Sequence, residues 1–278
     1  MTTPAALKKY RIGDFAHYLG VSPTYLKHYE SNGLLNVQTA ESGYRFYSFD
    51  QSARVLEYLR LKSYGVNVKD MQALLESTPT AAMHALNAKT DELRAEIARM
   101  QSVVEEHERL QAWMARRAKK PINWEITDVE PYYFLFHSHM TDFLKDEAIY
   151  EILQAWVAWL PITKSALYVR QGKNGEPTQT FWGLAIPCRL AERYQLPINK
   201  AVIKLTFEKT FVFHFCGLKG AFGMKSIVAG EHPAQVQMAK LGFAAAGDAL
   251  LLNEMRLSDK DGQATDCLGR FLIPIASD

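Results

Sequence analysis

The chain has 278 residues, 48% of them hydrophobic and 22% charged, which is typical of a folded globular protein with room for two domains. Its net charge of +2 does not by itself indicate a nucleic-acid partner, although the first 120 residues carry 17 Lys and Arg against 13 Asp and Glu, a difference of +4 that permits DNA binding. Cys188, Cys216 and Cys267 lie far apart and form no CxxC or Cys/His cluster, which excludes a disulfide framework and a structural zinc site.

The first predicted elements are two short helices joined by a tight turn. The apolar face of the first helix consists of Ile12, Phe15, Ala16 and Leu19. Ser22 is a good N-cap for the second helix, Pro23 suits its first turn, and Gly33 ends it. Two such helices are typical of a helix-turn-helix, whose second helix enters the major groove of DNA. The same spacing also occurs in helical domains that bind no DNA.

A short hairpin and two more helices are expected next. Residues 34–47 predict two strands around a polar tip from Thr39 to Gly43. A hairpin directly after a recognition helix is typical of a winged arrangement, in which the hairpin reaches the phosphate backbone. Helices are predicted at residues 48–65 and 67–77.

Residues 80–118 predict one long helix with a heptad seam, because they contain neither Gly nor Pro and are charged throughout. The seam consists of Leu86, Leu93, Met100, His107 and Met114, interleaved with Thr90, Ile97, Val104 and Gln111. Such a narrow apolar stripe needs a partner helix, most simply the same helix of a second chain. The alternative is a surface helix packed on its own domain.

Pro121 breaks this helix, and a second domain is expected from there. The predicted strands are residues 125–137, 165–171, 179–187 and 201–215, then the segments ALLLNEMRL and CLGRFLIPI. The predicted helices are FLKDEAIYEILQAWVAWLP and residues 232–246. The order strand, helix, strand, strand occurs twice, which predicts a duplicated α+β unit.

The amino-terminal segments YRIGDFAHYLGVSPTYLKHYESNGLL, SGYRFYSFDQ and LRLKSYGVNVKDMQALL resemble the DNA-binding domain of the MerR family of transcription regulators. The resemblance implies a winged helix-turn-helix at 1–79, an antiparallel coiled-coil dimerisation helix at 80–120 and an effector domain at 121–278. It also implies a homodimer on a palindromic double-stranded promoter. There it would distort an over-long spacer so that RNA polymerase engages both promoter elements, which activates transcription, or represses it without ligand.

By this resemblance the DNA contacts lie on the second helix, the hairpin and the following helix. The candidate DNA-binding residues are Thr24, Tyr25, Lys27, His28, Tyr44, Arg45 and Lys62. Lys27, Arg45 and Lys62 are expected at phosphates, and the residues on the second helix at bases or phosphates. The alternatives are packing inside the hairpin for Tyr44, as expected for Tyr47, and a solvated helix face for Lys62.

Two positions depart from the Thr-Leu-Arg-Tyr-Tyr sequence that the family has in the second helix. Lys27 keeps the charge of the family's arginine but lacks its bidentate geometry, and His28 replaces an aromatic ring. These departures affect the expected base preference rather than DNA binding itself.

Residues 125–275 resemble the GyrI-like effector domain of the multidrug-binding branch of the family, and Glu254 carries much of the resemblance. A carboxylate inside an apolar strand is costly unless it is paired. In that branch a glutamate in this strand meets small lipophilic, cationic ligands among aromatic rings. The candidate ligand-binding residues are Glu254, Tyr168, Trp182, Tyr133, Phe215 and Phe271, with Phe222 as a further ring. Each ring taken alone is more often a core residue.

Arg256 complicates this interpretation. It stands where the family has an aromatic residue, and strand alternation puts it on the same face as Glu254. An ion pair between them would leave a pocket for neutral or anionic compounds. An exposed edge strand is the other alternative.

Other kinds of site have little support in the sequence. The metal-sensing branches of the family have Cys near the end of the dimerisation helix and the redox-sensing branch has four clustered Cys, so we expect neither a metal nor a cofactor. His137 and His139 share one expected strand face but form no larger cluster.

No nucleophile–base pair is evident, so no catalytic residue is expected. The rival functions are hydrolysis of small electrophiles by the second domain and ligand-independent shaping of DNA.

Without an apolar signal segment or a run of about 18 apolar residues, the cytosol is the expected compartment and no membrane partner is expected.

Overall fold

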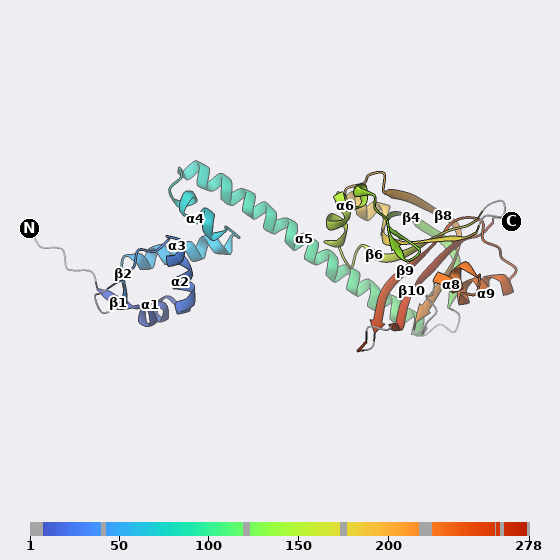
Figure 1. The fold of residues 1–278 in the computed structure, drawn as a ribbon, viewed down its shortest axis with the longest axis horizontal. Coiled ribbons are helices and arrows are strands. Elements are labelled where there is room, and N and C mark those ends of the chain that lie inside the picture. Colours follow the sequence, from blue (N-terminus) through green and yellow to red (C-terminus); the bar gives the residue numbers. More distant parts are fainter. Residues whose placement is uncertain are drawn as a thin grey trace, which may run out of the picture. The chain divides into compact units, whose positions relative to one another are not determined.

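The computed structural model describes residues 8–39, 43–118, 123–172, 177–216, 224–258, 260–261 and 264–276. They form two compact units, Met1–Arg99 and Met100–Asp278 (Figure 1). The helix α5 (Pro79–Ala118) is 40 residues long and is shared between the two units. A separate coiled-coil domain at 80–120 stays a prediction. In the structure the helix is divided between the units, and its part from Met100 onwards belongs to the second unit.

The first unit contains the two short helices and the hairpin that the sequence predicts. Its elements are β1 (Lys9–Arg11), α1 (Ile12–Leu19), α2 (Pro23–Ser31), β2 (Gln38–Thr39), β3 (Arg45–Ser48), α3 (Gln51–Ser63), α4 (Val68–Leu75) and the start of α5. The strands form an antiparallel sheet in the order β1-β3-β2. The hairpin is confirmed, and β1 is a third strand that the sequence pattern did not indicate.

Local chemistry explains the helix boundaries in this unit. The Ser22 side chain accepts a hydrogen bond from the Tyr25 backbone N–H at 3.2 Å, as an N-cap does. Gly20 and Gly33 have φ values of 67° and 73°, which suit glycine at the two turns. The helices then bury one core, in which Leu26, Tyr29 and Tyr47 are each 0% exposed.

The second unit begins with the end of α5 and continues with strands and short helices. Its strands are β4 (Trp124–His139), β5 (Asp142–Phe143), β6 (Lys164–Arg170), β7 (Gln179–Pro187), β8 (Val202–Cys216), β9 (Ala249–Ser258) and β10 (Ala264–Pro274). Its helices are α6 (Glu147–Val157), α7 (Cys188–Arg193), α8 (Met224–Val228) and α9 (Pro233–Lys240). The predicted order of strand, helix, strand, strand is present twice; β5, α7 and α8 were not predicted.

The strands of this unit form one antiparallel sheet in the order β5-β4-β7-β6-β9-β10-β8. An additional pairing of β4 with β8 closes six of the strands into a ring. Residues that alternate along each strand therefore point either into the closed sheet or towards the outer helices.

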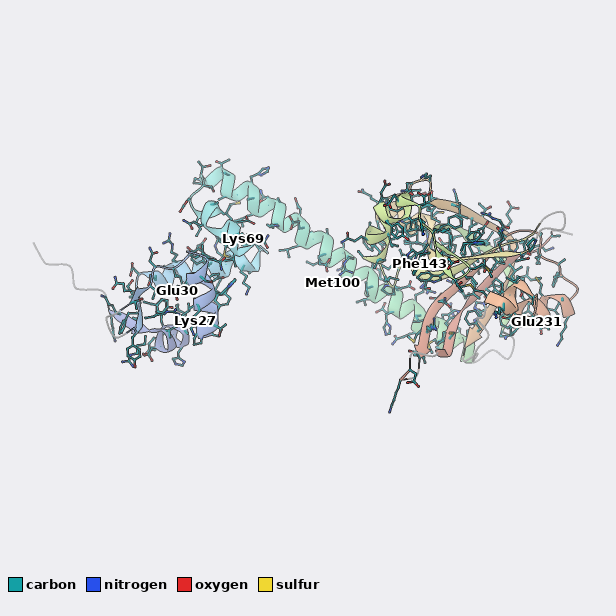
Figure 2. All side chains as sticks on the ribbon, viewed as in Figure 1. Lys27, Glu30, Lys69, Met100, Phe143 and Glu231 are labelled. Carbon is teal, nitrogen blue, oxygen red and sulfur yellow. The ribbon has the colours of Figure 1, made fainter. Side chains whose placement is uncertain are left out.

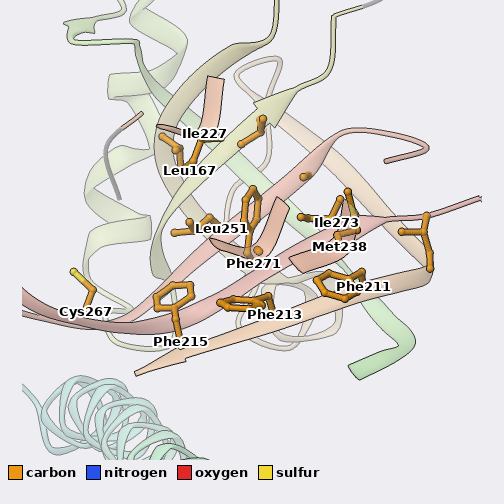
Figure 3. Packing of buried hydrophobic residues seen from close by; sticks show 14 residues of the cluster. Leu167, Phe211, Phe213, Phe215, Ile227, Met238, Leu251, Cys267, Phe271 and Ile273 are labelled. Atoms are coloured by element: carbon orange, nitrogen blue, oxygen red, sulfur yellow. The ribbon is translucent and has the colours of Figure 1, made fainter. Parts of the chain in front are cut away.

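Three apolar clusters follow from this alternation. The cluster of inward-pointing residues includes Phe134, Tyr168 and Leu272. On the outside, one cluster packs α6 against the sheet through Trp156, and another packs α8 and α9 against β8 and β10. Figure 3 shows this last cluster, in which Phe211, Phe213 and Phe215 of β8 lie near Phe271 and Ile273 of β10. The core of the second unit is thus split by its sheet into an interior and an exterior.

Candidate DNA-binding surface and charged pocket

The second helix of the predicted helix-turn-helix exposes one polar face. Leu26 and Tyr29 anchor α2 in the core, whereas Thr24, Lys27 and His28 are exposed. The label of Lys27 in Figure 2 marks its place on this helix. A short helix held by two buried residues can present its other side to a groove of DNA.

Tyr25 and Lys62 lie together beside this face. The Tyr25 hydroxyl is hydrogen-bonded to the Tyr29 hydroxyl, and the two rings meet edge to face with centroids 4.6 Å apart. The Lys62 ammonium lies 4.5 Å from the centroid of the Tyr25 ring. Burial and the neighbouring Tyr25 raise the pKa of Tyr29 well above its usual range. Tyr25 is therefore fixed by its neighbours rather than free on the surface.

The hairpin is tied to α2 through Glu30. The Glu30 carboxylate lies 3.4 Å from Arg45 Nε and accepts a hydrogen bond of 3.3 Å from the Tyr47 hydroxyl. Burial and Glu30 raise the pKa of Tyr47 to about 12. Tyr44 is 54% exposed, and the guanidinium of Arg11 lies 4.7 Å from its ring centroid. Sequence reasoning missed Arg11 because the strand β1 that carries it was not predicted.

In the second unit, the buried carboxylate of Glu254 is held by three cations. Its side chain is 1% exposed, and its Oε1 accepts from Arg270 Nε at 3.1 Å and from Arg270 Nη2 at 3.0 Å. Its Oε2 lies 2.6 Å from Lys164 Nζ and 2.7 Å from Arg109 Nη2. Burial alone raises the pKa of Glu254, but Lys164, Arg270 and Arg109 outweigh burial and lower it to about 2. A carboxylate offers about four acceptor positions, and all of them are occupied here.

Two further residues extend this Glu254 cluster. Glu106 of α5 accepts from Arg109 Nε at 2.8 Å and from Arg109 Nη2 at 2.7 Å, and it also pairs with Lys164. Burial raises the pKa of Glu106, but its hydrogen bonds with Arg109 and Lys164 outweigh burial and lower it. The buried Tyr132 hydroxyl lies 3.5 Å from Arg270 Nη2. The cluster therefore joins α5 to four strands of the closed sheet.

Arg256 is not the partner of Glu254, and the reason is a β-bulge. In the pairing of β9 with β10, Leu268 opposes Met255 while the next residue, Gly269, opposes Asn253, so Glu254 is an extra residue. After the bulge the alternation is shifted by one, which turns Arg256 away from the face of Glu254. Arg256 is exposed. The expectation that they share one strand face is therefore wrong.

The candidate aromatic residues do not gather around Glu254. Tyr168 lies inside the closed sheet and donates to Asp248 Oδ2 at 2.6 Å, and Trp182 donates to Ser165 Oγ at 2.8 Å. Phe215 and Phe271 are 2% and 1% exposed in the outer cluster of Figure 3, and Tyr133 packs on the α6 side. Phe222 lies outside the described residues. The structure thus places these rings in three separate clusters, in which Tyr168, Phe215 and Phe271 are buried and Trp182 and Tyr133 are partly buried.

His137 and His139 also lie apart. In the pairing of β4 with β7 a register shift falls at His137, and its ring lies 4.9 Å from Trp182 while His139 lies 4.8 Å from Phe181. The shift therefore separates two side chains that simple alternation puts on one face. Over the described part of the chain, no cluster of three or more His, Cys, Asp or Glu side chains has the arrangement of a metal site.

A second set of contacts joins α5 to the sheet through His214. Trp113 Nε1 donates to His214 Nδ1 at 3.0 Å, and His214 Nε2 lies 2.8 Å from Glu125 Oε1, which also accepts from Arg117. Because Nδ1 accepts a hydrogen bond from the Trp113 indole, this histidine is neutral, carries its proton on Nε2 and donates to Glu125. Burial and Arg117 lower the pKa of His214 to about 4, against the opposing effect of Glu125.

We expect this histidine to make the second unit sensitive to mild acid. Its pKa is lower in the folded chain than the unfolded value of 6.5, so the unfolded state binds more protons and stability falls as the pH drops from 6.5 towards 4. The expected loss from this group is about 2 kcal/mol at a pH of about 5. Denaturant unfolding at several pH values measures it.

The control for this experiment is His214→Gln, because His232 has a pKa lowered to about 4 by burial and contributes to the same slope. In the variant, the slope of the unfolding free energy against pH should decrease by the equivalent of about one proton, and the part of the slope due to His232 should remain. An unchanged slope in the variant would contradict the assignment.

The residues around Glu254 line a pocket of about 210 Å³ within the second unit, although Glu254 itself does not reach its surface. Its lining consists of Ser102, Glu105, Glu106, Arg109, Glu130, Tyr132, Ile162, Lys164, Pro187, Arg189, Leu190, Arg193, Tyr194 and Arg270. The sequence indicated Glu254 but not the three cations that hold it. Arg270 could have been predicted as one of them, because it too is a charged residue within an apolar stretch of its strand and therefore needs a partner.

The first unit thus has the form of a winged helix-turn-helix DNA-binding domain. The family described as MerR HTH family regulatory protein matches residues 10–78, so this segment of the chain is a MerR-type helix-turn-helix. No helix in the described ranges is both long enough and apolar enough to span a bilayer.

Similar proteins share this amino-terminal part. The nodulation protein NolA of Bradyrhizobium diazoefficiens is 29% identical over 93 residues, which are 33% of this chain and 39% of that protein. The multidrug-efflux transporter 2 regulator of Bacillus subtilis is 32% identical over 94 residues, 33% of this chain and 34% of that protein. The crystal structure of the N-terminus of MtaN, the Bacillus subtilis multidrug transporter activator, is 26% identical with a TM-score of 0.33, covering 37% of this chain and 97% of that one. The matched region spans well under half the length of both full-length relatives.

Proposed function

We propose that the chain is a homodimeric transcription regulator of the cytosol that binds a palindromic promoter and responds to a small ligand held in its second unit. The observation that carries the proposal is the MerR-type helix-turn-helix with its exposed α2 face. Distortion of the promoter spacer for RNA polymerase, with activation or repression depending on ligand, is the mechanism we infer for it. The pocket over the Glu254 cluster supports a sensor role for the second unit.

The exposed seam of α5 supports the dimer. Leu93, Ile97, Met100 and Val104 are 40%, 56%, 55% and 57% exposed. Figure 2 marks Met100 on this helix. Apolar side chains at heptad spacing favour pairing with a second helix, which would remove this area from water.

Introducing a charge into the seam is expected to weaken the dimer. Ile97→Glu places a carboxylate where a partner helix would bury an isoleucine, so we expect the dimer to dissociate at least about tenfold more readily. Sedimentation equilibrium over a range of concentrations measures the change. Arg94→Glu is the control, because Arg94 is 73% exposed and lies outside the seam. A monomeric parent chain, or equal effects of both variants, would refute a dimer through this seam.

A loss of charge on α2 is expected to weaken DNA binding at every sequence. Lys27→Gln removes one proposed phosphate contact, so affinity for promoter and non-specific DNA should fall alike and the slope of log affinity against log salt should decrease by about 1. Fluorescence anisotropy with a labelled duplex measures both quantities.

Lys240→Gln is the matched control for this experiment. Lys240 is exposed on α9 of the second unit, so the variant has the same charge change away from the proposed DNA surface. We expect its affinity and salt slope to equal those of the parent. If the intact chain binds no duplex DNA, or if both lysine variants behave alike, the proposed surface is wrong.

The arrangement around Glu254 does not favour hydrolysis of small electrophiles. As a general base Glu254 would have to accept a proton from water, but its carboxylate already accepts hydrogen bonds from three cationic side chains. A carboxylate with a strongly lowered pKa and no free acceptor position is a poor general base.

A further inference from the structure

We propose that the pocket over the Glu254 cluster binds a small organic oxyanion, through its carboxylate or phosphate group, and not the cationic ligand expected from the sequence. This inference rests on the proposed sensor role of the second unit and names the ligand class of that site. It follows from the charges around the pocket and from the hydrogen-bonding positions that are still open there.

The carboxylates of the inner pocket have little capacity left for a cation. Glu254 is 1% exposed and its two oxygens accept from Arg270, Lys164 and Arg109. Glu106, 12% exposed, accepts two bonds from Arg109 and one from Lys164. A cationic ligand would have to displace one of these buried cations, which would then lose its partner.

The inner pocket instead has an excess of positive charge. Three cations, Arg109, Lys164 and Arg270, face two carboxylates, Glu106 and Glu254, so the inner group carries +1. Lys164 is 7% exposed and Arg270 18% exposed, so water screens this charge poorly. An anion in the pocket would bring the inner group to neutrality.

The rim of the pocket adds arginine donors. Arg189 is paired with Glu130 at 2.7 Å, and Glu105 also lies in the lining, but no ion pair among the described residues includes Arg193. The guanidinium of Arg193 lies 5.4 Å from the ring centroid of Tyr194, another lining residue. An arginine with its planar donors free is well suited to bind a carboxylate or a phosphate in a bidentate manner.

Size and shape limit the ligand. Pockets for drug-sized ligands usually exceed about 300 Å³, and the volume here is about 210 Å³, so a compact molecule fits better than a large one. Tyr132 and Tyr194 line the pocket, and Trp159 stacks on Tyr194 at 4.0 Å. These rings favour a small aromatic or otherwise planar body behind the anionic group.

Four probes of similar size and different charge test the inference on the intact chain. They are benzoate, phenyl phosphate, benzylammonium and benzyl alcohol, each titrated calorimetrically at one fixed ionic strength. We expect benzoate or phenyl phosphate to bind at least about tenfold more tightly than the cation and the alcohol. Comparison of the two anions shows which oxyanion the pocket prefers. Tighter binding of benzylammonium, or no binding of either anion at millimolar concentration, would overturn the inference.

Two exposed arginines provide the variant and its control. Arg193→Gln should weaken binding of the preferred anion about tenfold, because it removes a free donor at the rim. Arg256→Gln removes the same charge from the other face of β9 and should leave the affinity unchanged. Since both side chains are on the surface, both variants are expected to fold. Equal affinities in the parent and Arg193→Gln would show that the anion does not bind at this site.

DNA binding separates this inference from the proposed function. If an anion binds in an Arg193-dependent manner but neither the DNA affinity nor the transcript level changes, the pocket assignment stands and the sensor role fails. If instead the cation or the alcohol changes the DNA response while neither anion binds, the sensor role stands and the oxyanion assignment fails.

Discussion

Glu254→Gln is expected to destabilise the second unit by about 3–5 kcal/mol in the absence of any ligand. The change leaves Lys164, Arg109 and Arg270 around a neutral amide, so a buried group that carried +1 would carry +2. The amide also has donors where the carboxylate had acceptors, which places N–H groups against cationic donors. Loss of one partner from a buried ionic network is among the largest effects of a single substitution.

Denaturant unfolding of the intact chain, followed by the circular dichroism of the sheet, measures the loss. Glu96→Gln is the matched control, because Glu96 also forms an ion pair with an arginine three residues later on α5 but is 44% exposed. We expect the control to change stability by less than about 1 kcal/mol. A similarly small loss for Glu254→Gln would mean that the cluster does not stabilise the fold, and a carboxylate kept for ligand binding alone would then be the better explanation.

Gly269→Ala is expected to cost about 3 kcal/mol, because no space exists for a methyl group at this point of β10. An added Cβ would lie 2.2 Å from the backbone oxygen of Leu252 and 2.5 Å from the ring of Phe215. The oxygen belongs to the neighbouring strand and cannot move without disturbing the ladder. Gly269 is also the residue at which the register shifts beside Glu254, so the same substitution should disturb the charged pocket.

Gly13→Ala is the control for steric cost. Nothing lies within 4 Å of a Cβ at Gly13, which is inside α1, and alanine favours a helix by about 1 kcal/mol over glycine. Thermal unfolding measures both effects. For Gly269→Ala we expect a large drop in the melting temperature of the second unit. For Gly13→Ala we expect a small rise or no change in the melting temperature of the first unit. Retention of the parent melting temperature by Gly269→Ala would show that the strands can separate at low cost.

Local sequence signals were sufficient to predict most of the fold. Ser22, Pro23 and the glycines at 20 and 33 determine where the first helices begin and end, and each acts through its own backbone neighbourhood. The repeated order of strands and helices also followed from periodicity. By contrast, the sheet closes through the pairing of β4 with β8, which joins segments far apart in the sequence and leaves no local signal.

The charged pocket was harder to predict for the same reason. A lone glutamate in an apolar strand indicated that Glu254 needs a partner, but Arg109 is 145 residues away along the chain. The partner proposed from alternation, Arg256, failed because a bulge inserts one residue at the critical place. The candidate rings were chosen for their chemistry, and aromatic residues in strands most often belong to the core, as Phe215 and Phe271 do.

The bulge in β9 also affects how relatives of this chain should be compared. Because the extra residue at position 254 shifts every later side chain to the opposite face, positions before and after it follow different alternation rules. A relative with the same letters in this strand but one residue fewer would turn its carboxylate or its arginine towards the other face. Two such proteins would align almost perfectly and still place different charges beside the pocket, so the length of this strand decides as much as its composition which side chains lie there.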